Sequence, residues 1–216
     1  MLSRRLTALV DFIGADEIVA DVGSDHGLLL LGLAEKKNLK KGYAMDIAEG
    51  PLKQAEKNIA ASTFTNIETI LAPGLSQLPA DVTVVVIAGM GFNTIKKILE
   101  DDWDKLEQVK EIVIQCNSQV VLLRGYLAVK QVAIVDELWV NDYKDYQFIK
   151  FNLRDKRTYS QAEIYFGPCL LKAKTPEFIV YYRKHRDKLS AINRRHHSDE
   201  ISHELELLER NLEDFF

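Results

Sequence analysis

The stretch Ile18-Val-Ala-Asp-Val-Gly-Ser-Asp-His-Gly27 decides how the first half of the chain is interpreted. Its apolar start indicates a buried strand over 17–21, and a helical pattern follows over 27–36. From the end of the strand to the start of the helix, residues 21–27 hold two acids, a histidine and two glycines. Glycine lets a backbone turn tightly and approach a ligand closely. The stretch therefore predicts a ligand site, although the glycines alone could form no more than a tight strand-to-helix turn.

Strands and helices continue to alternate through the first 153 residues. The run over 82–88 has no polar alternation, which is typical of a strand buried on both faces of a parallel sheet. This alternation, which ends in a hairpin, predicts an α/β fold with a Rossmann-like doubly wound sheet in a domain over 1–158. The other expected strands cover 42–46, 66–71, 111–115, 132–140 and 146–153, and the other expected helices cover 51–62, 93–100 and 119–130.

The remaining residues, 159–216, have a different pattern. Apolar residues recur at spacings of four and three in two registers, and Thr175-Pro176 supplies an N-cap and a first-turn proline. We expect a coiled-coil-like antiparallel helical hairpin. Residues 171–197 hold eight Lys or Arg and two Asp or Glu, whereas 198–216 hold one Arg and seven Asp or Glu. The basic helix is either a solvated face or a surface for nucleic acid phosphates.

Bulk composition argues against several classes of protein. The chain is 47% hydrophobic and 28% charged with a net charge of -4, which is ordinary for a globular protein. No apolar run approaches the roughly 18 residues of a membrane helix, and no signal-peptide cleavage site follows the N-terminus. The distant Cys116 and Cys169 indicate reduced thiols rather than a disulfide framework or a zinc site. We expect a cytoplasmic protein with no bound metal and no membrane contact.

The spacing of the glycines favours S-adenosylmethionine (SAM) as the ligand. The pattern D-x-G-x-x-x-G differs from the G-x-G-x-x-G loop that binds a pyrophosphate, and SAM carries no phosphate. Asp46, at the end of the second strand, can accept hydrogen bonds from both ribose hydroxyls, although it could instead cap the next helix. Met90, after the fourth strand, could be core filler. The candidate cofactor residues are Asp21, Gly23, Ser24, Gly27, Asp46, Ile47, Gly74, Ala88, Gly89 and Met90.

These motifs resemble the bacterial TrmK-type tRNA (adenine-N1)-methyltransferases, which modify adenine 22 of tRNA. The resemblance covers nearly the whole chain. It implies a class I SAM-dependent methyltransferase domain, tRNA as the partner, and a helical hairpin that helps to hold tRNA. The matching stretches are 3–6 (Ser-Arg-Arg-Leu), 21–26 (Asp-Val-Gly-Ser-Asp-His), 49–51 (Glu-Gly-Pro), 87–91 (Ile-Ala-Gly-Met-Gly), Gln115 with Asn117, and 166–168 (Phe-Gly-Pro). The RNA-binding candidates are Arg4, Arg5, Arg183, Lys184, Arg186, Lys188, Arg194 and Arg195.

The chain departs from the family pattern at several places. Phe92 stands where a further glycine is usual, and Cys116 stands where a proline often precedes Asn117. After the third strand, Ala72-Pro73-Gly74 replaces an Asp or Asn before glycine that is expected to contact the adenine of SAM. After Asp25-His26, the apolar residues 27–30 replace a small residue followed by Tyr-Leu-Pro. These departures concern SAM affinity and the fit of the target base, not the fold.

Methyl transfer to adenine N1 requires no prior removal of a proton, because N1 of an unpaired adenine has a free lone pair. The product base is a cation, so a carboxylate beside it is favourable. Asp25 is the candidate for that catalytic role, and His26 and Asn117 are candidates for orienting the base through hydrogen bonds. A purely structural role for His26 is the alternative.

Two other interpretations remain open for the chain as a whole. It could methylate a small molecule or a protein, in which case the polarised hairpin would be a dimerisation device and tRNA would not bind. It could also be a catalytically degenerate, RNA-binding relative, which Ala72-Pro73 and Phe92 make conceivable. The sequence leaves the oligomeric state open between a monomer and a weak dimer.

Overall fold

The computed structural model describes residues 2–215, apart from the side chain of Asp214. The chain divides into two compact units, Met1–Thr158 and Tyr159–Phe216. They are called the N-terminal unit and the C-terminal unit, and each contains a buried core of its own.

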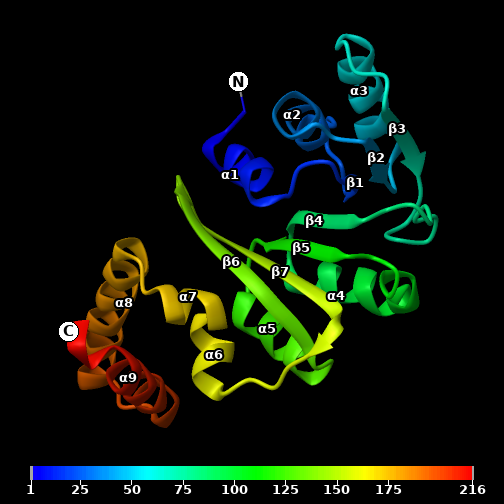
Figure 1. Cartoon of the computed structure of the whole chain (residues 1–216). Helices are drawn as coiled ribbons and strands as arrows, with labels where there is room; N and C mark the ends of the chain where they lie inside the picture. Colours follow the sequence, from blue (N-terminus) through cyan, green and yellow to red (C-terminus); the bar gives the residue numbers. More distant parts are fainter. Residues whose placement is uncertain (1, 216) are drawn as a thin grey trace. The chain divides into compact units, whose positions relative to one another are not determined.

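A seven-stranded sheet with the order β3-β2-β1-β4-β5-β7-β6 forms the N-terminal unit (Figure 1). Strands β1 to β5 are parallel, whereas β7 pairs antiparallel with β5 and β6. The strand order reverses beside β1, which is where open α/β sheets bind their ligands. This topology confirms the predicted Rossmann-like doubly wound sheet. The strands are β1 (Ile18–Val22), β2 (Lys41–Asp46), β3 (Ile67–Leu71), β4 (Val84–Met90), β5 (Glu111–Cys116), β6 (Val132–Asp142) and β7 (Lys144–Lys156).

Helices cover both faces of this sheet (Figure 1). The first three share one apolar core with strand residues such as Val19, Val84 and Phe148, and the next two pack against each other on the other face. Because β4 is covered on both faces, the residues from Val84 to Ile87 are fully buried, which explains their continuous apolar run. The helices are α1 (Arg4–Phe12), α2 (Leu28–Lys37), α3 (Glu49–Ala60), α4 (Phe92–Asp101) and α5 (Val120–Val129), with the short 3₁₀ helix η1 (Trp103–Leu106) after α4.

The N-terminal helix α1 is an element that the sequence analysis did not predict. Ser3 caps it, because Ser3 Oγ accepts a hydrogen bond from the N–H of Leu6 (3.2 Å). Leu9 and Val10 are buried on the face that packs against α2 and β6. The serine cap and this apolar pair were the signals from which the helix could have been inferred.

Strand β4 extends to Met90, beyond the predicted end at 88, because it contains a bulge. Its register against β5 shifts between Ala88 and Met90, and Gly89 has a φ of +80°. A glycine in the left-handed region lets a strand stay paired on both sides of such an irregularity. The bulge therefore carries β4 to the carboxyl edge of the sheet.

The C-terminal unit is helical in all of its regular elements that the structure describes. Helices α8 and α9 form the predicted antiparallel hairpin, since Asn193 Nδ2 lies 3.0 Å from Ser202 Oγ near the turn and His185 Nε2 lies 2.9 Å from Glu204 Oε1 farther along. Thr175 is the N-cap of α8, as expected. The helices are α6 (Gln161–Phe166), α7 (Pro168–Ala173), α8 (Pro176–Arg195) and α9 (Asp199–Leu212), followed by the 3₁₀ helix η2 (Glu213–Phe215).

The short helices α6 and α7 were not predicted, and they complete the core of the C-terminal unit. Phe166 of α6 is fully buried with Phe178 and Tyr182 of α8, and the ring centroids of Phe166 and Tyr182 lie 4.8 Å apart. The apolar stripe expected along α8 is buried at Leu189, but Ile192 is 38% exposed. The hairpin is therefore packed most tightly in the first part of α8, where α6 contributes to the core.

Within residues 2–215, no helix is long and apolar enough to cross a membrane. The same part of the chain holds no group of three or more His, Cys, Asp or Glu side chains that could bind a metal ion. Cys116 is a buried free thiol at the end of β5.

Candidate active site

The loop between β1 and α2 is folded back against the end of β2. The N–H groups of Gly23 and Ser24 both donate to the carbonyl oxygen of Met45 (2.8 and 3.0 Å). Gly23, His26 and Gly27 have positive φ angles of 77°, 64° and 68°. Glycine adopts this conformation freely, whereas histidine, like other residues with a side chain, adopts it uncommonly. The loop therefore has a defined shape at the carboxyl edge of the sheet.

Asp21 of β1 is a buried acid directly below this loop. Burial raises its pKa to about 6; a hydrogen bond from Ser24 Oγ (2.6 Å) opposes the shift, the charge of Asp46 adds to it and the charge of Arg5 opposes it. The Asp21 carboxylate is ionised at pH 7 at a free-energy cost, since its charge is poorly solvated. A positively charged ligand beside Asp21 would lower that cost.

Two cavities open along the same edge of the sheet. One has a volume of about 440 Å³ and the other of about 270 Å³, and they meet at three shared residues, Gly23, Asp46 and Met90. The larger cavity is also lined by Arg5, Leu6, Leu9, Asp21, Asp25, His26, Leu28, Leu29, Ala88 and Gly89. The smaller cavity is also lined by Val22, Ile47, Ala72, Pro73, Gly74, Thr94, Lys97, Ile98, Asp101 and Asp102. Most of the cofactor residues expected from the sequence are therefore brought together here.

Gly23 and Met90 are in direct contact where the two cavities meet. A Cβ atom built on Gly23 would lie 2.2 Å from Met90 Cε, which no real contact permits. Met90 is only partly buried and lines both cavities, so it is a wall of the site and not core filler. Because Gly23 has no side chain, the methyl group of Met90 can occupy the space beside it.

The bulge at Gly89 is completed by side chains from β5 and the residues that follow it. The Gly89 N–H donates to Gln115 Oε1 (3.1 Å), Asn117 Nδ2 donates to the Gly89 carbonyl (2.6 Å), and Gln115 Nε2 donates to Asn117 Oδ1 (3.2 Å). We call these three residues the Gly89 ring. Arg5 Nη1 donates to Gln115 Oε1 (2.8 Å) from outside the ring. Each bond pairs a donor with an acceptor, so both amides are fixed in one orientation.

Asp25 and His26 lie at the rim of the larger cavity. Asp25 Oδ1 is 3.1 Å from His26 Nε2, and their side chains are 71% and 48% exposed. The His26 carbonyl accepts a hydrogen bond from Asn58 Nδ2 (2.8 Å), which ties the loop to α3. The arrangement leaves the Asp25 carboxylate accessible to a group that enters the cavity from solvent.

Asp46 lies at the mouth of both cavities. Its Oδ1 accepts a hydrogen bond from the N–H of Ala48 (2.9 Å), and Ala48 is the N-cap residue of α3. The alternative in which Asp46 caps the helix is therefore wrong. Asp46 Oδ2 has no hydrogen-bond partner within residues 2–215, and the side chain of Ile47 beside it is 72% exposed.

Three of the predicted catalytic and cofactor residues line neither cavity. Ser24 supports the Asp21 carboxylate, and Asn117 reaches the site only through Gly89. Gly27 is the N-cap position of α2, where an added Cβ would lie 3.3 Å from Ala55 Cβ. Ser24 and Gly27 therefore act on the shape of the loop, whereas Asn117 is exposed beside the Gly89 bulge.

One wall of the smaller cavity was not predicted from the sequence. Helix α4 starts immediately after Gly91. Four of its residues line the smaller cavity, and their spacing of three and four places them on one face of the helix. The ammonium of Lys97 is 2.7 Å from Asp101 Oδ2 on this face. The signal that could have identified the wall is an amphipathic helix directly after two glycines. The residues concerned are Thr94, Lys97, Ile98 and Asp101, with Asp102 next to them.

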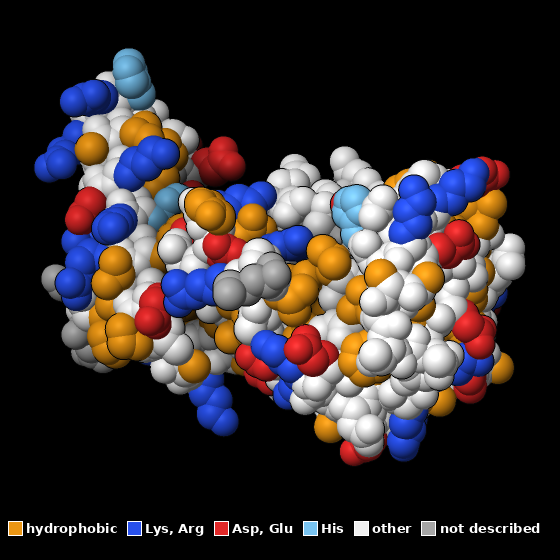
Figure 2. Space-filling view, turned by 90° about the horizontal axis from the view of Figure 1, so that it is seen from above, with side chains coloured by type: hydrophobic (Ala, Val, Ile, Leu, Met, Phe, Trp, Pro, Cys, Tyr) orange, Lys and Arg blue, Asp and Glu red, His pale blue; other side chains and the backbone are white. Residues whose placement is uncertain are grey.

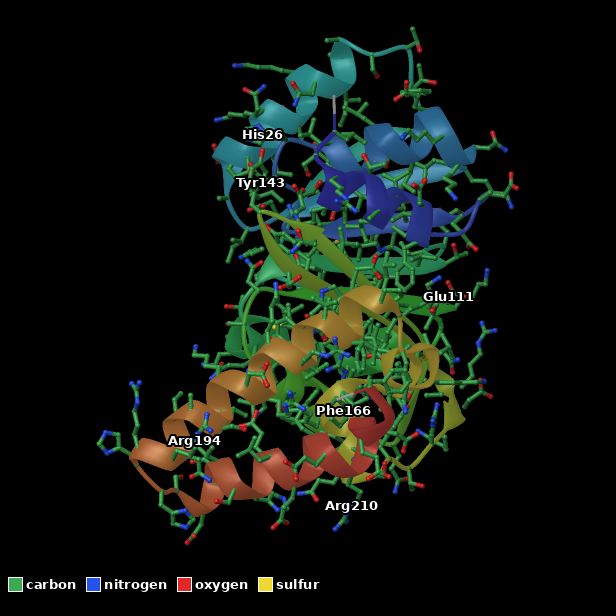
Figure 3. The ribbon with its side chains drawn as sticks, turned by 90° about the vertical axis from the view of Figure 1, so that its left-hand side faces the viewer. His26, Glu111, Tyr143, Phe166, Arg194 and Arg210 are labelled. Carbon is green, nitrogen blue, oxygen red and sulfur yellow. The ribbon has the colours of Figure 1, made fainter. Side chains whose placement is uncertain are left out.

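The RNA-binding candidates differ in whether their side chains form ion pairs or hydrogen bonds within the protein. Lys184, Lys188, Arg194 and Arg195 of α8 are exposed and form no ion pair with the residues that the structure describes. Figure 2 shows Lys and Arg side chains gathered on the C-terminal unit, and Figure 3 shows Arg194 near the end of α8.

The remaining RNA-binding candidates have partners or lie elsewhere. Arg186 pairs with Asp187 (2.6 Å), and Arg183 donates to the carbonyl of Phe215. In the N-terminal unit, Arg4 is exposed and lines a separate open groove. Arg5 is half-buried and lines the larger cavity, so it is placed at the candidate active site.

A model of the family TrmK, described as tRNA (adenine(22)-N(1))-methyltransferase, matches residues 19–215. The chain belongs to the TrmK family. The matched range contains the sheet except for Ile18, both glycine-containing loops and the helical hairpin, and it begins after α1.

Relatives of known structure support this assignment. The tRNA (adenine(22)-N(1))-methyltransferase of Bacillus subtilis (strain 168) is 28% identical over 186 residues, which cover 82% of this chain and 78% of that protein. The crystal structure of Streptococcus pneumoniae Sp1610 in complex with S-adenosyl-L-methionine has a TM-score of 0.88 at 30% identity and covers 98% of this chain and 100% of that one. The structure of M. capricolum TrmK with S-adenosyl-homocysteine has a TM-score of 0.85 at 27% identity and covers all of both chains.

The departures from the TrmK pattern fall both outside and inside the two cavities. Phe92 is half-buried in the first turn of α4 and lines neither cavity. Cys116 is buried, its Sγ donates to the carbonyl of Ser118 (2.8 Å), and burial raises the pKa of its thiol, as expected for an unreactive cysteine. Ala72 and Pro73 line the smaller cavity, and Leu28 and Leu29 line the larger one, so these departures touch the site.

Proposed function

We propose that this chain transfers the methyl group of SAM to N1 of adenine 22 in tRNA, in the cytoplasm. The observation that carries the proposal is the TrmK match over residues 19–215, which contains most of the walls of two joined cavities at the switch point of the sheet. Fold alone would not identify a substrate, because the Rossmann-like sheet serves many reactions.

The residues around the two cavities fit SAM. The smaller cavity has apolar walls, including Ile47, Pro73 and Ile98, that suit the flat adenine ring. Asp46 Oδ2 is available for ribose hydroxyls at the junction of the cavities. Asp21 and the other acids of the larger cavity suit the positively charged end of the cofactor. Gly23 and Met90, which pack directly against each other, line the junction between these regions.

Bound SAM supplies an electrophilic methyl group on a sulfonium centre. The protein then has to present adenine N1 to that methyl group and keep it aligned, because the nitrogen already carries a lone pair. Alignment alone can provide effective molarities of roughly 10⁵ M or more. No residue of the site has to act as a general base on the acceptor.

Asp25 and Asn117 suit the acceptor base for different reasons. Methylation at N1 turns the base into a cation, and the accessible Asp25 carboxylate at the cavity rim would stabilise the charge that develops. Asn117 uses one N–H and one lone pair in the Gly89 ring, which leaves one of each for a base edge. His26 would position Asp25 through their 3.1 Å contact.

The exposed cations of α8 suit the phosphates of tRNA. Lys184, Lys188, Arg194 and Arg195 are extended in solvent without internal ion pairs among the described residues, so their charges are available to a partner. Contacts of this kind add affinity without sequence selectivity. Selection of the target base would then rest on the N-terminal unit.

The proposal is tested by incubating the protein with isotope-labelled SAM and an unmodified tRNA transcript, followed by nucleoside analysis. We expect 1-methyladenosine from a transcript with adenine at position 22 and none from a matched transcript with guanine there. Label in both transcripts would contradict the assigned position. SAM binding without transfer would favour the degenerate relative, and label only on a small molecule or protein would favour the other alternative.

A further inference from the structure

The hairpin of β6 and β7 extends past the carboxyl end of the neighbouring strand β5 (Figure 1). The pairing of β5 with β7 stops at Gln115 and Phe148, whereas β6 and β7 stay paired for four further residues each, 139–142 and 144–147. At about 3.3 Å per residue, this extension is about 13 Å long. Because β7 is antiparallel to β5, the tip of the hairpin lies at the carboxyl edge of the sheet, where the two cavities open.

The tip of the hairpin is held in a fixed position beside the larger cavity. The backbone N–H of Arg5, a residue that lines this cavity, donates to Asp142 Oδ2 (2.8 Å). Asp145 Oδ1 accepts hydrogen bonds from Trp139 Nε1 (2.9 Å) and Asn141 Nδ2 (3.0 Å), which tie the two strands together. A tip that is bonded in this way needs little further ordering when it binds a ligand.

Tyr143 joins the two strands at the tip, and its side chain lies wholly in solvent. Its relative exposure of 103% is the highest among the large apolar side chains of the described residues, and its φ is +60°. Figure 3 shows Tyr143 at the same edge of the sheet as His26, opposite Glu111 at the start of β5. A residue with positive φ in a hairpin turn is normally glycine, asparagine or aspartate.

The tyrosine at this position strains the turn without a compensating contact inside the protein. Its side chain forms no hydrogen bond and no ring contact with any residue that the structure describes. A strained residue of this kind is expected where the surroundings impose it or where a partner uses it. Because the ring of Tyr143 packs against nothing in residues 2–215, we look to a partner.

The charges at the tip favour a flat, neutral group over a phosphate as that partner. Residues 142–145 contain one lysine and two aspartates, so they have no excess of positive charge. The ammonium of Lys144 already lies 5.0 Å from the centroid of the Tyr146 ring. An exposed aromatic ring suits the face of an unpaired base, because bases of RNA loops and single strands bind proteins by stacking on such rings.

We propose that the ring of Tyr143 stacks on an unpaired base of tRNA next to the adenine that is presented to the larger cavity. The inference rests on the proposed function, since it takes tRNA as the substrate. An adenine that leaves its stack deprives the neighbouring bases of a stacking partner. Tyr143 follows Asp142, which is bonded to Arg5 at the cavity wall, so it is placed to supply a new partner. Tyr143 is then a positioning residue, because it holds tRNA and touches no reacting atom.

The first test compares two glycine variants of the full chain at positions with the same backbone conformation. Tyr143→Gly removes the ring together with the strain. We expect its dissociation constant for an unmodified tRNA transcript to rise by about 5- to 100-fold, as for the loss of one stacked base, and its melting temperature to stay equal or rise. Fluorescence anisotropy and thermal denaturation measure the two quantities.

Gln131→Gly is the matched control for this comparison. Gln131 is also exposed with a positive φ (56°), but it precedes β6 at the opposite, amino edge of the sheet. The substitution makes the same change of backbone freedom, and it should leave tRNA affinity at the wild-type value.

Two further variants separate stacking from other contacts of the ring. Tyr143→Phe keeps the ring and should bind tRNA within about twofold of the wild type, whereas Tyr143→Leu keeps apolar bulk only and should lose about as much affinity as Tyr143→Gly. For both affected variants we expect the loss in KM for tRNA and not in kcat. The salt dependence of tRNA binding should not change, because no charge is removed, and SAM affinity should stay as it is.

Several outcomes would overturn the proposal. One is wild-type tRNA affinity in Tyr143→Gly, and another is wild-type affinity in Tyr143→Leu, which would indicate a general apolar contact. A dimer of the wild type that Tyr143→Gly abolishes in light scattering, with tRNA affinity unchanged, would make the tip an interface between two copies. If the wild type neither bound nor methylated tRNA, the proposed function itself would be contradicted; if the wild type methylated adenine 22 and Tyr143→Gly bound tRNA equally well, only this assignment would be.

Discussion

Charged side chains are held in two different ways in the two units of this protein. Around the larger cavity, Arg5 and Asp21 are partly or fully buried and have fixed hydrogen-bond partners. On α8, cations such as Lys184 and Arg195 are extended in solvent. Fixed charges give geometry, whereas solvated charges give attraction that salt screens. Substitutions at the cavity should therefore change cofactor binding and turnover, and substitutions on α8 should change tRNA affinity.

The largest effect is expected at the cavity rim, from Asp25→Ala. In the proposed mechanism the carboxylate would face the developing positive charge on the base, so its loss should lower the single-turnover rate by about 10²- to 10³-fold. Because the side chain is 71% exposed, the melting temperature should change little. Asp25→Asn keeps the shape and removes the charge, and it should lose as much activity. Near-normal turnover in either variant would remove Asp25 from the mechanism.

The role of the solvated charges on α8 is tested by a variant in which four cations are replaced with glutamine. The four residues are Lys184, Lys188, Arg194 and Arg195. We expect the dissociation constant for tRNA to rise by about 10- to 100-fold near 0.1 M salt, and the slope of log K against log salt to fall by about three. SAM affinity should stay as it is. Fluorescence anisotropy at several salt concentrations gives both quantities, and an unchanged slope would refute the role of α8.

The control for the α8 variant removes four exposed cations from the amino edge of the sheet. The two cavities lie at the other, carboxyl edge. These residues lie at the end of α2, just before β2 and at the end of β7, away from both cavities. The variant has the same net charge as the α8 variant, so it separates a local surface from the overall charge. We expect its salt slope to match that of the wild type. The four residues are Lys36, Lys40, Arg154 and Lys156.

A smaller effect is expected where the two cavities meet, from Gly23→Ala. The new Cβ would lie 2.2 Å from Met90 Cε at a φ of +77°, so Met90 must move and the backbone is strained. We expect SAM affinity to fall by about tenfold in calorimetry. Adding Met90→Ala should restore part of it by removing the clash but not the strain. Gly50→Ala is the control, because nothing lies within 4 Å of its added Cβ; equal effects at both glycines would contradict this explanation.

The smallest effect concerns stability, from Asp21→Asn. Burial raises the pKa of Asp21 from 3.8 to about 6, so the ionised carboxylate opposes folding, and this cost grows between about pH 4 and pH 6 and is constant above. Asparagine can still accept from Ser24 without the charge. We expect unfolding in urea at pH 7.5 to require about 1 kcal/mol more than in the wild type, below the limit of roughly 3 kcal/mol set by the shift. The gain should be smaller at pH 5, and an equal gain at both pH values would exclude the charge as its cause.

Much of the fold and part of the site could be predicted from local sequence pattern. Apolar runs gave the strands of the sheet, and in such a sheet the ends of parallel strands must meet at one edge. That geometry was enough to bring Gly23, Asp46 and Met90 together from different parts of the chain. The roles of the site residues stay predictions, since they depend on the bound ligands.

The rest of the site depends on contacts that local patterns do not encode. Arg5 meets Gln115 across 110 residues of sequence, and nothing near Arg5 distinguishes it from the exposed Arg4 beside it. Helices α6 and α7 were missed because they are short, although Ser160 and Glu163 form a capping box that marks the start of α6. Short elements are decided by the core that they complete rather than by their own propensities.

The Gly89 ring has a consequence for how this chain can diverge. A change at Gln115 or Asn117 removes a hydrogen-bond partner of the other residue and of the Gly89 backbone. A side chain at Gly89 keeps the backbone groups but strains the φ of +80° at which they are presented. The three positions are therefore coupled in evolution. In an alignment of descendants we expect them to be kept or replaced together, whereas the cations of α8 can drift one at a time.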